Sequence, residues 1–379
     1  MNRKIIPVFK PSFGREELDA LKEPFKTGWI GLGPKTKEFE EKFARYIGTA
    51  YASAMNSCTA ALHLAVKLME VKGKEVITTP LTFVSTNHAI LYNGGIPVFC
   101  DIEEDALNID ATKIEKLVTK KTAAVIVVHY GGYACDMDKV MSLAKKYGLR
   151  VIEDCAHACG GEYKGRKLGS IGDMACFSFH AVKNMSTGEG GMVTTNDEVM
   201  YNRLKKLRWL GISMDTFSRE QKDTKKYSWD YEVEELGFKY HMHDITAAIG
   251  LVQLAKLDTM NKRREKIVNK YNMGLKGLPW IETPVRKEYA KPAYHNYVIK
   301  TAFRDRLNTY LKEHGISTGV HYRPNNHYAM YRQYKAATPV SDRVWQKLLT
   351  LPLYPDLTDS QVDMIIDEIK KFGKGLNNK

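Results

Sequence analysis

Short apolar runs alternate with amphipathic stretches of helical period between about residue 50 and residue 200, and this alternation constrains the fold more than any other feature. The alternation predicts a mainly parallel sheet covered by helices on both faces. In open sheets of this kind, ligands bind at the carboxyl ends of the strands. The strand-like runs are EVITT, PVFCD, AAVIVVH and LRVIED, and DMDKVMSLAKKYG is one of the helix-like stretches between them. We therefore expect the site at Asp101, His129, Asp154 and the segment after Phe179, where the runs end.

The pattern changes after about residue 280 to short strands and helices, which predicts a second, smaller α+β domain. With 379 residues and 44% hydrophobic composition, the chain is long enough for two domains. We place a large domain, including an N-terminal arm, at residues 1–250, and a helical linker with the small C-terminal domain at residues 251–379. The elements expected after residue 280 are the strands YHNYVIK and STGVHY and the helices FRDRLNTYLKEHG and DSQVDMIIDEIKKFG.

Two segments lie between these regions. Residues 215–235 form a polar connection that is too long for an ordinary loop, which indicates a functional or partner-contacting segment. A strongly helical stretch follows from His243 to about residue 278, with a predicted break near Asp258.

The chain is basic, with 57 Lys and Arg against 44 Asp and Glu and a formal net charge of +13. This excess indicates an anionic partner. Nucleic acid is not expected, because the basic residues lie among acids and no RNP motif, zinc finger or basic zipper occurs. No apolar run approaches the roughly 18 residues of a membrane span, and the N-terminus lacks the apolar core of a signal peptide, which predicts a cytoplasmic protein without membrane contact.

The cysteines are scattered through apolar stretches of a large chain. This placement favours reduced, buried thiols over disulfides, and no metal site is expected. The six are Cys58, Cys100, Cys135, Cys155, Cys159 and Cys176.

The stretch NSCTAALHLAV has small hydroxyl-bearing residues directly before a helical pattern. The backbone N–H groups of its first turn, around Ser57, Cys58 and Thr59, would point at whatever lies in front of the helix. Such a helix end favours an anion, and a phosphate most of all. The alternative is an ordinary N-cap without a ligand.

The strand VIED ends in two acids that cannot face the same way, because successive side chains of a strand alternate. Asp154 is the last residue and lies at the crevice end, where its carboxylate would hold a proton on a heteroaromatic nitrogen. His157 follows within reach of the same ring, with a hydrogen-bonded core histidine as the alternative.

The stretch CFSFHAVKNMSTGEGG places one lysine between a strand-like run and a glycine-rich loop. In a dry pocket beside a cationic partner, the amine of Lys183 would be neutral and able to attack a carbonyl to form a Schiff base. Ser178 and Ser186 offer hydroxyls near a phosphate, and the glycines let the backbone approach closely. The alternative is a solvated loop lysine.

Together, a phosphate cup, an acid that ends a strand and a lysine 29 residues later describe the anchoring of pyridoxal phosphate. Phe83, in TTPLTFVSTNHAI, is a candidate to stack on the ring face opposite the acid, although an aromatic side chain there also suits a core.

At this point the sequence resembles the DegT/DnrJ/EryC1/StrS sugar aminotransferases, which have pyridoxal-phosphate fold type I. The similarity runs from about residue 5 to residue 370. It implies an aspartate aminotransferase-like α/β fold, with a large, mainly parallel sheet and a smaller C-terminal domain. The motifs that carry the resemblance are NSCTAALHLAV, PLTFVST, VVHYGG, VIEDCAHACGG, FSFHAVKN with GEGG, and DITAAIGLVQL.

The resemblance implies roles for individual residues. Lys183 would form the internal aldimine, Asp154 would pair with the pyridine nitrogen, and His157 would lie near the ring hydroxyl. Ser57, Cys58, Thr59 and Ser178 would hold the phosphate, and Phe83 would stack. Family members are typically homodimers with shared sites, to which the partner contributes from the segment matching GFKYHMHD. Lys239 and His241 stand there where many relatives carry Asn and Arg, so either one is a candidate to reach the phosphate. Substrate contacts are expected from His180, His321 and Arg323.

The activity implied is the transfer of an amino group from L-glutamate to a nucleotide-linked keto sugar. GEGG resembles members that aminate C4, whereas members that aminate C3 often show GDGG or GDAG. Lys183 also argues against the related dehydratases, which carry histidine at this position. The alternatives are amination at C3 and a regulatory protein that binds pyridoxal phosphate without turnover. A nucleotide-binding dehydrogenase would need a G-x-G-x-x-G turn after an early strand, and the sequence has none there.

Overall fold

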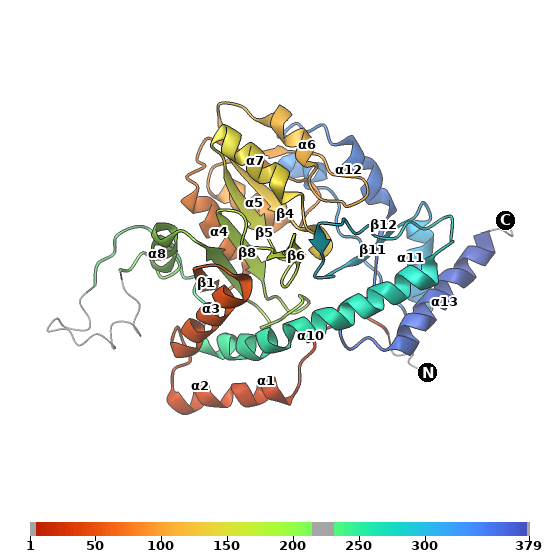
Figure 1. Cartoon of the computed structure of the whole chain (residues 1–379), viewed down its shortest axis with the longest axis horizontal. Helices are drawn as coiled ribbons and strands as arrows, with labels where there is room; N and C mark the ends of the chain where they lie inside the picture. Colours follow the sequence, from red (N-terminus) through yellow and green to blue (C-terminus); the bar gives the residue numbers. More distant parts are fainter. Residues whose placement is uncertain (1–4, 214–230, 377–379) are drawn as a thin grey trace.

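The computed structural model describes residues 5–213 and 231–376 and centres on a seven-stranded sheet (Figure 1). The strand order is β1-β9-β8-β5-β4-β2-β3. Strands β8, β5, β4, β2 and β3 are parallel to their neighbours in this row, and β9 is antiparallel to both β1 and β8. The predicted mixed, mainly parallel sheet is confirmed. Its strands are β1 (Tyr51–Met55), β2 (Glu75–Thr78), β3 (Ile96–Phe99), β4 (Thr122–Val128), β5 (Arg150–Asp154), β8 (Met174–Ser178) and β9 (Gly191–Thr195).

Alternate side chains of the central strands enter two separate apolar layers. On β4, Val125 and Val127 pack with α3, α7 and α10, whereas Ala124 and Ile126 pack with α4, α5 and α8. Because successive side chains of a strand point to opposite faces, helices cover both faces of the sheet. The helices are α3 (Pro34–Ile47), α4 (Cys58–Leu68), α5 (Val84–Tyr92), α7 (Met137–Tyr147), α8 (Glu198–Leu207) and α10 (Asp244–Leu275).

Helix α10 is continuous over 32 residues, so the predicted break near Asp258 is wrong. Leu257 and Met260, on either side of Asp258 in sequence, are both buried in the core under the large sheet. The Asp258 carboxylate accepts the Tyr46 hydroxyl at 2.6 Å near the surface. The helix therefore continues because its inner face keeps packing, while the aspartate finds a partner at the outer face.

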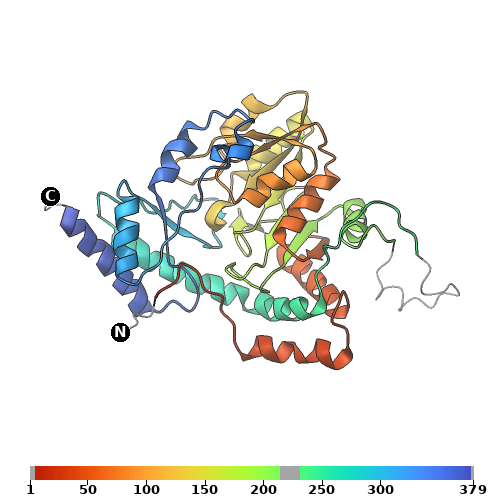
Figure 2. The same ribbon diagram turned by 180° about the vertical axis from the view of Figure 1, so that it is seen from behind.

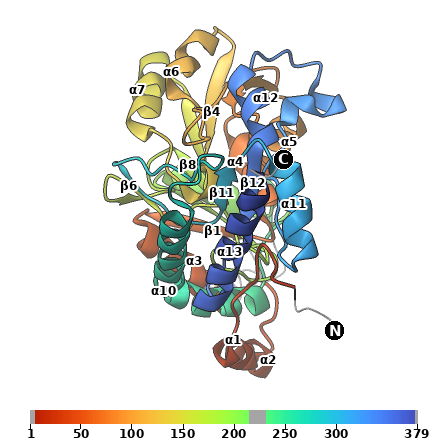
Figure 3. The same cartoon turned by 90° about the vertical axis from the view of Figure 1, so that its right-hand side faces the viewer.

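The C-terminal part of the chain packs around the far end of α10 (Figure 3). Strand β11 (Tyr297–Lys300) pairs antiparallel with β12 (Leu348–Leu351), and α11 (Arg304–Glu313) and α13 (Asp359–Leu376) complete its apolar core. Helix α13 lies alongside α10. The domain boundary proposed after residue 250 falls inside α10 and stays a prediction.

The segment STGVHY was expected to form a strand, and within the described residues it makes only an isolated bridge between Gly319 and Thr350. Gly319 and Thr350 exchange backbone hydrogen bonds of 3.1 and 2.8 Å. The chain then leaves β12 so that His321 and Tyr322 line a cavity of the large sheet.

The remaining elements are short. Helices α1 (Arg15–Ala20) and α2 (Lys22–Thr27) lie beside α10 on the outside of the molecule (Figures 1 and 2). The others are α6 (Ala111–Ile114), α12 (Pro339–Val344), β6 (Glu162–Tyr163), β7 (Arg166–Lys167), β10 (Ala290–Lys291) and the 3-10 turns 115–117, 130–132, 325–327, 329–331 and 345–347.

Three further expectations concern the whole chain. Most of the polar connection 215–235 lies outside the described residues. All six cysteines are buried free thiols, as expected. Of the helices described, none is both long and apolar enough to cross a membrane.

Candidate active site

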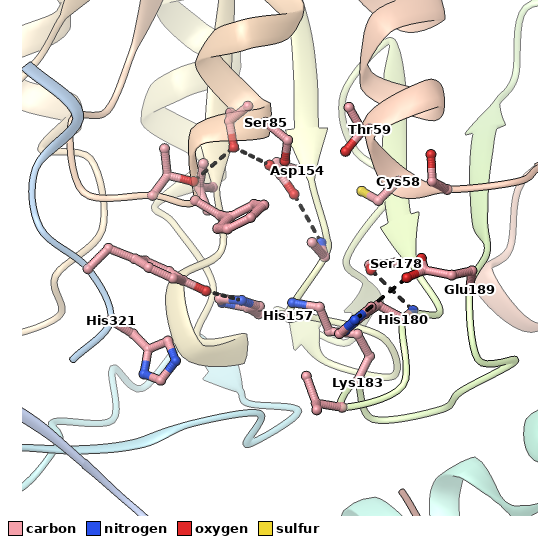
Figure 4. Close-up of a pocket in the computed structure, with 18 residues that line it drawn as sticks. Cys58, Thr59, Ser85, Asp154, His157, Ser178, His180, Lys183, Glu189 and His321 are labelled. Atoms are coloured by element: carbon pink, nitrogen blue, oxygen red, sulfur yellow. Dashed lines mark hydrogen bonds and ion pairs between the residues drawn. The ribbon is translucent and has the colours of Figure 1, made fainter. Parts of the chain in front are cut away.

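A cavity of about 450 Å³ lies at the carboxyl ends of β4, β5 and β8 (Figure 4). It forms where the strand pattern predicts a ligand site. The cavity brings together predicted residues from segments far apart in sequence: Ser57, Cys58, Thr59, Phe83, Asp154, His157, Ser178, His180, Lys183 and His321. The other two strand-end candidates have structural partners, because Asp101 accepts the N–H groups of Val340 and Ser341 at the start of α12 and His129 contacts Glu153.

The N-terminus of α4 faces this cavity. Ser57 is the N-cap, and its hydroxyl oxygen accepts the Ala60 N–H at 3.1 Å. The amides of the first turn, around Cys58 and Thr59, are therefore available to a ligand. Gly191 packs against this turn, since a Cβ there would lie 2.5 Å from the Ser57 carbonyl oxygen. The last glycine of GEGG thus lets β9 approach the helix start, and the resulting cup suits a phosphate.

Asp154 is buried at the end of β5 with two hydrogen-bond donors. The Thr86 hydroxyl donates to Oδ2 at 2.7 Å, and the Ala156 N–H donates to Oδ1 at 3.1 Å. Burial raises the pKa of this carboxyl, although Thr86, Ala156 and Lys183 act in the opposite direction. A cation brought to Asp154 would relieve the cost of burying its charge.

Lys183 lies in the loop after β8 and its amine contributes to the cavity (Figure 4). Burial lowers the pKa of the amine to about 8, while Cys58 and Asp154 act to raise it. The cationic neighbour expected from the sequence is therefore not the cause, because desolvation is sufficient. With this pKa, about a tenth of Lys183 is neutral, and hence nucleophilic, at pH 7.

His157 is held on both ring nitrogens. Its Nδ1 accepts the Gly131 N–H at 3.3 Å, and its Nε2 lies 3.1 Å from the Tyr322 hydroxyl. Because Nδ1 is an acceptor, the proton of the neutral ring is on Nε2, the nitrogen beside Tyr322. Burial lowers the pKa of His157 well below its usual value, and the charges of Lys183 and His321 add to this. His157 is therefore a neutral donor.

The three residues predicted to contact substrate occupy different places. His180 lines the cavity, and its Nε2 lies 3.7 Å from the Glu189 carboxylate. His321 also lines it, with Nδ1 2.8 Å from the Thr350 hydroxyl, and burial lowers its pKa to about 4. Arg323 is outside the set of described residues that line the cavity, and its guanidinium lies 5.1 Å from the ring centroid of Tyr328.

Phe83 is the aromatic residue predicted to stack on a ligand. It lines the cavity, keeps 57% of its surface exposed and lies 6.1 Å from the Tyr322 ring. An exposed aromatic ring at a cavity wall is available for stacking.

Lys239 and His241 do not line the cavity of their own chain, as far as the described residues show. Both contact Trp209: the Lys239 amine lies 3.4 Å from the indole ring centroid, and the His241 ring meets the indole edge to face at 4.4 Å. The role of Lys239 or His241 in the phosphate site of a partner chain therefore stays a prediction.

The sequence reasoning missed five polar residues of the cavity. Thr82, Ser85 and Thr86 lie in the quoted motif PLTFVST, and Tyr322 directly follows the predicted His321. Glu189 is part of GEGG, but only its glycines were interpreted. Ser186 was expected near a phosphate, but its hydroxyl instead accepts the Gly188 N–H and, of the residues described, it is not one that lines the cavity.

A second polar cluster, on the opposite face of β5, contains His129, Glu153 and Cys155. The donor and acceptor atoms of His129 and Glu153 are already paired with other protein groups. Glu153 accepts four hydrogen bonds, and His129 Nδ1 accepts the Cys135 N–H at 3.1 Å, so its Nε2 donates to Glu153. A metal would have to displace these bonds, and the cluster is better explained as structural.

The fold and the cavity together define an aminotransferase-like enzyme of pyridoxal-phosphate fold type I. The sequence profile of the DegT/DnrJ/EryC1/StrS aminotransferase family matches residues 11–370, so the chain belongs to this family.

Relatives and solved structures agree with this assignment. The spore coat polysaccharide biosynthesis protein SpsC of Bacillus subtilis is 42% identical over 382 residues, covering 98% of this chain and 97% of SpsC. The structure of the aminotransferase TlmJ from Streptoalloteichus hindustanus superposes with a TM-score of 0.92 at 32% identity, covering 99% of this chain and 100% of TlmJ. The PLP form of Spr1654, a putative sugar aminotransferase from Streptococcus pneumoniae, gives 0.90 at 31% identity, covering 98% and 99%. The protein is a pyridoxal-phosphate-dependent sugar aminotransferase.

The residues of the cavity fit this cofactor. The cup at the start of α4 suits the phosphate of the cofactor. The buried carboxylate of Asp154, whose pKa is raised, suits a protonated ring nitrogen, and the Lys183 amine suits the aldehyde group. The groups expected to bind the phosphate, the ring nitrogen and the aldehyde of the cofactor therefore all line one cavity.

Proposed function

We propose that this enzyme transfers the amino group of L-glutamate to C4 of a nucleotide-linked 4-keto sugar. The observation that carries the proposal is the placement of the Lys183 amine, with its lowered pKa, in one cavity with Asp154 and the α4 N-terminus. GEGG at residues 188–191, which resembles the C4-aminating members of the family, supports the ring position. The polysaccharide pathway of SpsC is consistent with an activated sugar as substrate.

When bound, pyridoxal phosphate supplies an electron sink that stabilises negative charge at the carbon from which a proton is removed. The protein supplies the proton transfers and the positioning. Lys183 would anchor the cofactor, and its freed amine would remove the proton from the donor's α-carbon and return one to the product carbon. Its lowered pKa suits both roles, because an amine that titrates near the working pH both takes up and gives back a proton.

The remaining side chains orient the cofactor and exclude water. Asp154 would hold the proton on the ring nitrogen, and the neutral donor His157 would lie near the ring hydroxyl; the pKa directions of both side chains suit these roles. Ser57, Cys58, Thr59 and Ser178, which line the cavity at the start of α4, would hold the phosphate, and Phe83 would cover the ring.

The keto sugar enters the same cavity beside His180 and His321. Arg323 directly follows Tyr322 in the chain, and we assign it to the pyrophosphate of the nucleotide, where a guanidinium forms paired hydrogen bonds. These contacts would use part of the excess positive charge of the chain.

We further propose a homodimer in which Lys239 or His241 reaches the partner's phosphate site. Exposed apolar side chains support this, because helices α1 and α2 present Leu18 and Phe25 with 68% and 63% of their surface accessible. Leu236, three residues before Lys239, is 84% exposed. Such side chains are typical of a surface that is covered in an assembly.

A cytoplasmic location, where thiols stay reduced, agrees with the six free cysteines.

The test is a half-reaction followed by a substrate panel. Purified protein reconstituted with pyridoxal phosphate should lose its visible absorption band when L-glutamate is added, and 2-oxoglutarate should appear in equal amount. UDP-, GDP- and dTDP-linked 4-keto and 3-keto sugars would then be offered, with NMR of the product to locate the amino group. The matched control is Lys183→Ala, which should give neither reaction.

Each outcome decides one part of the proposal. Amination at C3 would overturn the ring position, and a reaction with free keto sugars alone would overturn the nucleotide linkage. A coloured protein indifferent to glutamate and to every sugar would favour the regulatory alternative.

A further inference from the structure

Three aromatic rings stack in a column that leads from the surface to the cavity. The Phe9 ring lies 5.2 Å from His295 with an angle of 7° between the ring planes. His295 in turn stacks on His157 at 4.3 Å and 29°. His157 lines the cavity and is labelled in Figure 4, whereas Phe9 and His295 are not among its described lining residues. Through this column, the N-terminal segment is connected to His157 by one intervening ring.

His295 connects the column to the loop that carries Lys183. Its Nδ1 lies 3.1 Å from the Asn184 Oδ1, and because that oxygen only accepts, Nδ1 carries the proton. The Asn184 amide nitrogen donates to the Ala293 carbonyl at 2.7 Å and to Asn261 Oδ1 at 2.8 Å. Asn184 is thus fixed on both sides, and it is the residue next to Lys183. A tilt of the His295 ring would disturb this contact and the stack on His157 together.

The outer end of the column is anchored by backbone hydrogen bonds. Ile6 donates to the Gly315 carbonyl and accepts the Ser317 N–H, each at 2.9 Å, and the Val8 carbonyl accepts the Leu353 N–H at 3.0 Å. Phe9 follows directly and also meets the edge of the His321 ring at 5.4 Å. The segment is therefore held on the C-terminal part of the chain, and its aromatic ring presses on one histidine behind the cavity and one that lines it.

We propose that Phe9 is a positioning residue that holds His295 in place and thereby fixes both the ring of His157 and the Lys183–Asn184 segment. Stacked aromatic rings prefer defined relative orientations and contribute energy beyond the area that they bury. Small misplacements at a reacting centre reduce turnover strongly, even when they originate outside the cavity. The inference rests on the proposed contact of His157 and Lys183 with the cofactor.

The experiment compares four proteins reconstituted with pyridoxal phosphate: wild type, Phe9→Ala, Phe9→Leu and Phe9→Tyr. Leucine keeps apolar bulk without a flat ring, and tyrosine keeps the ring. Val8→Ala is the matched control, because it shortens a neighbouring side chain of the same segment while the backbone bond to Leu353 is retained. The readouts are the pH midpoint of the visible band of the bound cofactor, the dissociation constant of pyridoxal phosphate, kcat and KM, and the melting temperature.

For Phe9→Ala and Phe9→Leu we expect kcat to fall about tenfold with KM changed less than about twofold, because positioning acts on the reacting atoms. The pH midpoint of the band should move by about half a unit or more, since the surroundings of Lys183 change. Phe9→Tyr and Val8→Ala should behave as wild type.

The inference is overturned if Phe9→Leu matches wild type in kcat and in the pH midpoint, because apolar bulk would then be sufficient. A fall in melting temperature with an unchanged pH midpoint would also overturn it, since the role would be purely structural. Wild type that forms no band with pyridoxal phosphate would instead refute the proposed function, so the two failures are distinguishable.

Discussion

Two adjacent carboxyl groups at the end of β5 have opposite environments, although both are buried. Glu153 accepts hydrogen bonds from His129 and from the N–H groups of Gly169, Ile171 and Gly172, at 2.7 to 3.0 Å. Burial alone would raise its pKa, but these donors lower it below the usual value. Asp154, on the cavity side, has two donors, and burial keeps its pKa raised. The number of donors, rather than burial, separates the two groups.

The comparison extends to the rest of each face. On the cavity side, Lys183 is also displaced toward its neutral form by burial. On the far side, the His129 and Glu153 side chains satisfy each other within the protein. A buried polar group whose hydrogen bonding is incomplete costs stability. Its presence in a folded protein therefore indicates a function, such as binding a ligand that completes the hydrogen bonding. The far face is built for stability and the cavity face for a ligand.

The largest expected effect concerns Lys183. An amine with a pKa of about 8 has on the order of 300 times more neutral form at pH 7 than one with the ordinary value of 10.5. The rate at which added pyridoxal phosphate develops its visible band should rise with pH, because the neutral amine attacks, and should level off around a midpoint near pH 8. The measurement is stopped-flow absorbance from about pH 6 to pH 10. Lys183→Ala is the blank. A rate that still climbs steeply at the upper end would show that the amine titrates as an ordinary lysine.

Asp154→Asn should reduce transamination by about 100-fold, the value of one hydrogen bond to a charged group. The same substitution should not lower the melting temperature of the cofactor-free protein at pH 7. The reason is the sign of the pKa shift: a carboxyl whose pKa is raised in the folded state costs stability when it ionises, and asparagine removes that charge. Steady-state kinetics and thermal unfolding of the same preparation test both parts. Loss of stability with retained activity would reverse the assignment of Asp154.

Glu153→Gln should show the opposite pattern. In the variant, the NH₂ of the glutamine amide would replace one of the carboxylate oxygens that accept these N–H groups in wild type. The free energy of unfolding should therefore fall by about 2 kcal/mol at pH 7. Turnover per folded molecule should change little, because Glu153 points away from the cavity. In wild type, this contribution should be lost as pH falls through the lowered pKa, since a depressed carboxyl pKa stabilises the fold only above it. Urea unfolding measures the loss. If activity fell while stability held, the two faces would not be distinct in function.

The sequence was sufficient to place Asp154 and Glu153 on opposite sides of one strand. Strict alternation along VIED and the rule that ligands bind at strand ends decide this without tertiary information. The same reasoning led to Lys183 and to the helix start at Cys58, because each lies directly where a strand or helix pattern changes. These predictions needed only local periodicity.

What the sequence could not show was which distant segment completes each environment. The Tyr322 hydroxyl meets His157 across 165 positions of the chain, and Thr86 meets Asp154 across 68. The four donors of Glu153 come mainly from the turn at residues 169–172, which carries no motif of its own. Such contacts depend on how layers pack, and local patterns do not specify them. The break expected near Asp258 failed for the same reason, since packing on the inner face of α10 outweighs one polar residue.

The smallest expected effect tests whether the donors on Asp154 are matched to its role. The hydroxyls of Thr82 and Thr86 lie 2.8 Å apart, and Thr86 donates to Asp154. Because Thr86 uses its single proton on the carboxylate, Thr82 must donate to Thr86, which makes a short chain of bonds directed at Oδ2. Thr86→Val keeps the shape and removes the last link, so turnover should fall about fivefold, as expected for roughly 1 kcal/mol.

The acid limb of the pH profile should also move to higher pH in Thr86→Val, since the hydroxyl acts to lower the pKa of Asp154. Thr82→Val is the matched control, and it should have a smaller effect because its hydroxyl acts through Thr86. If Thr86→Val instead left the acid limb in place and lowered only the melting temperature, the hydroxyl would serve packing alone. The number of donors would then not explain the pKa of Asp154, and the contrast between the two faces of β5 would rest on Lys183.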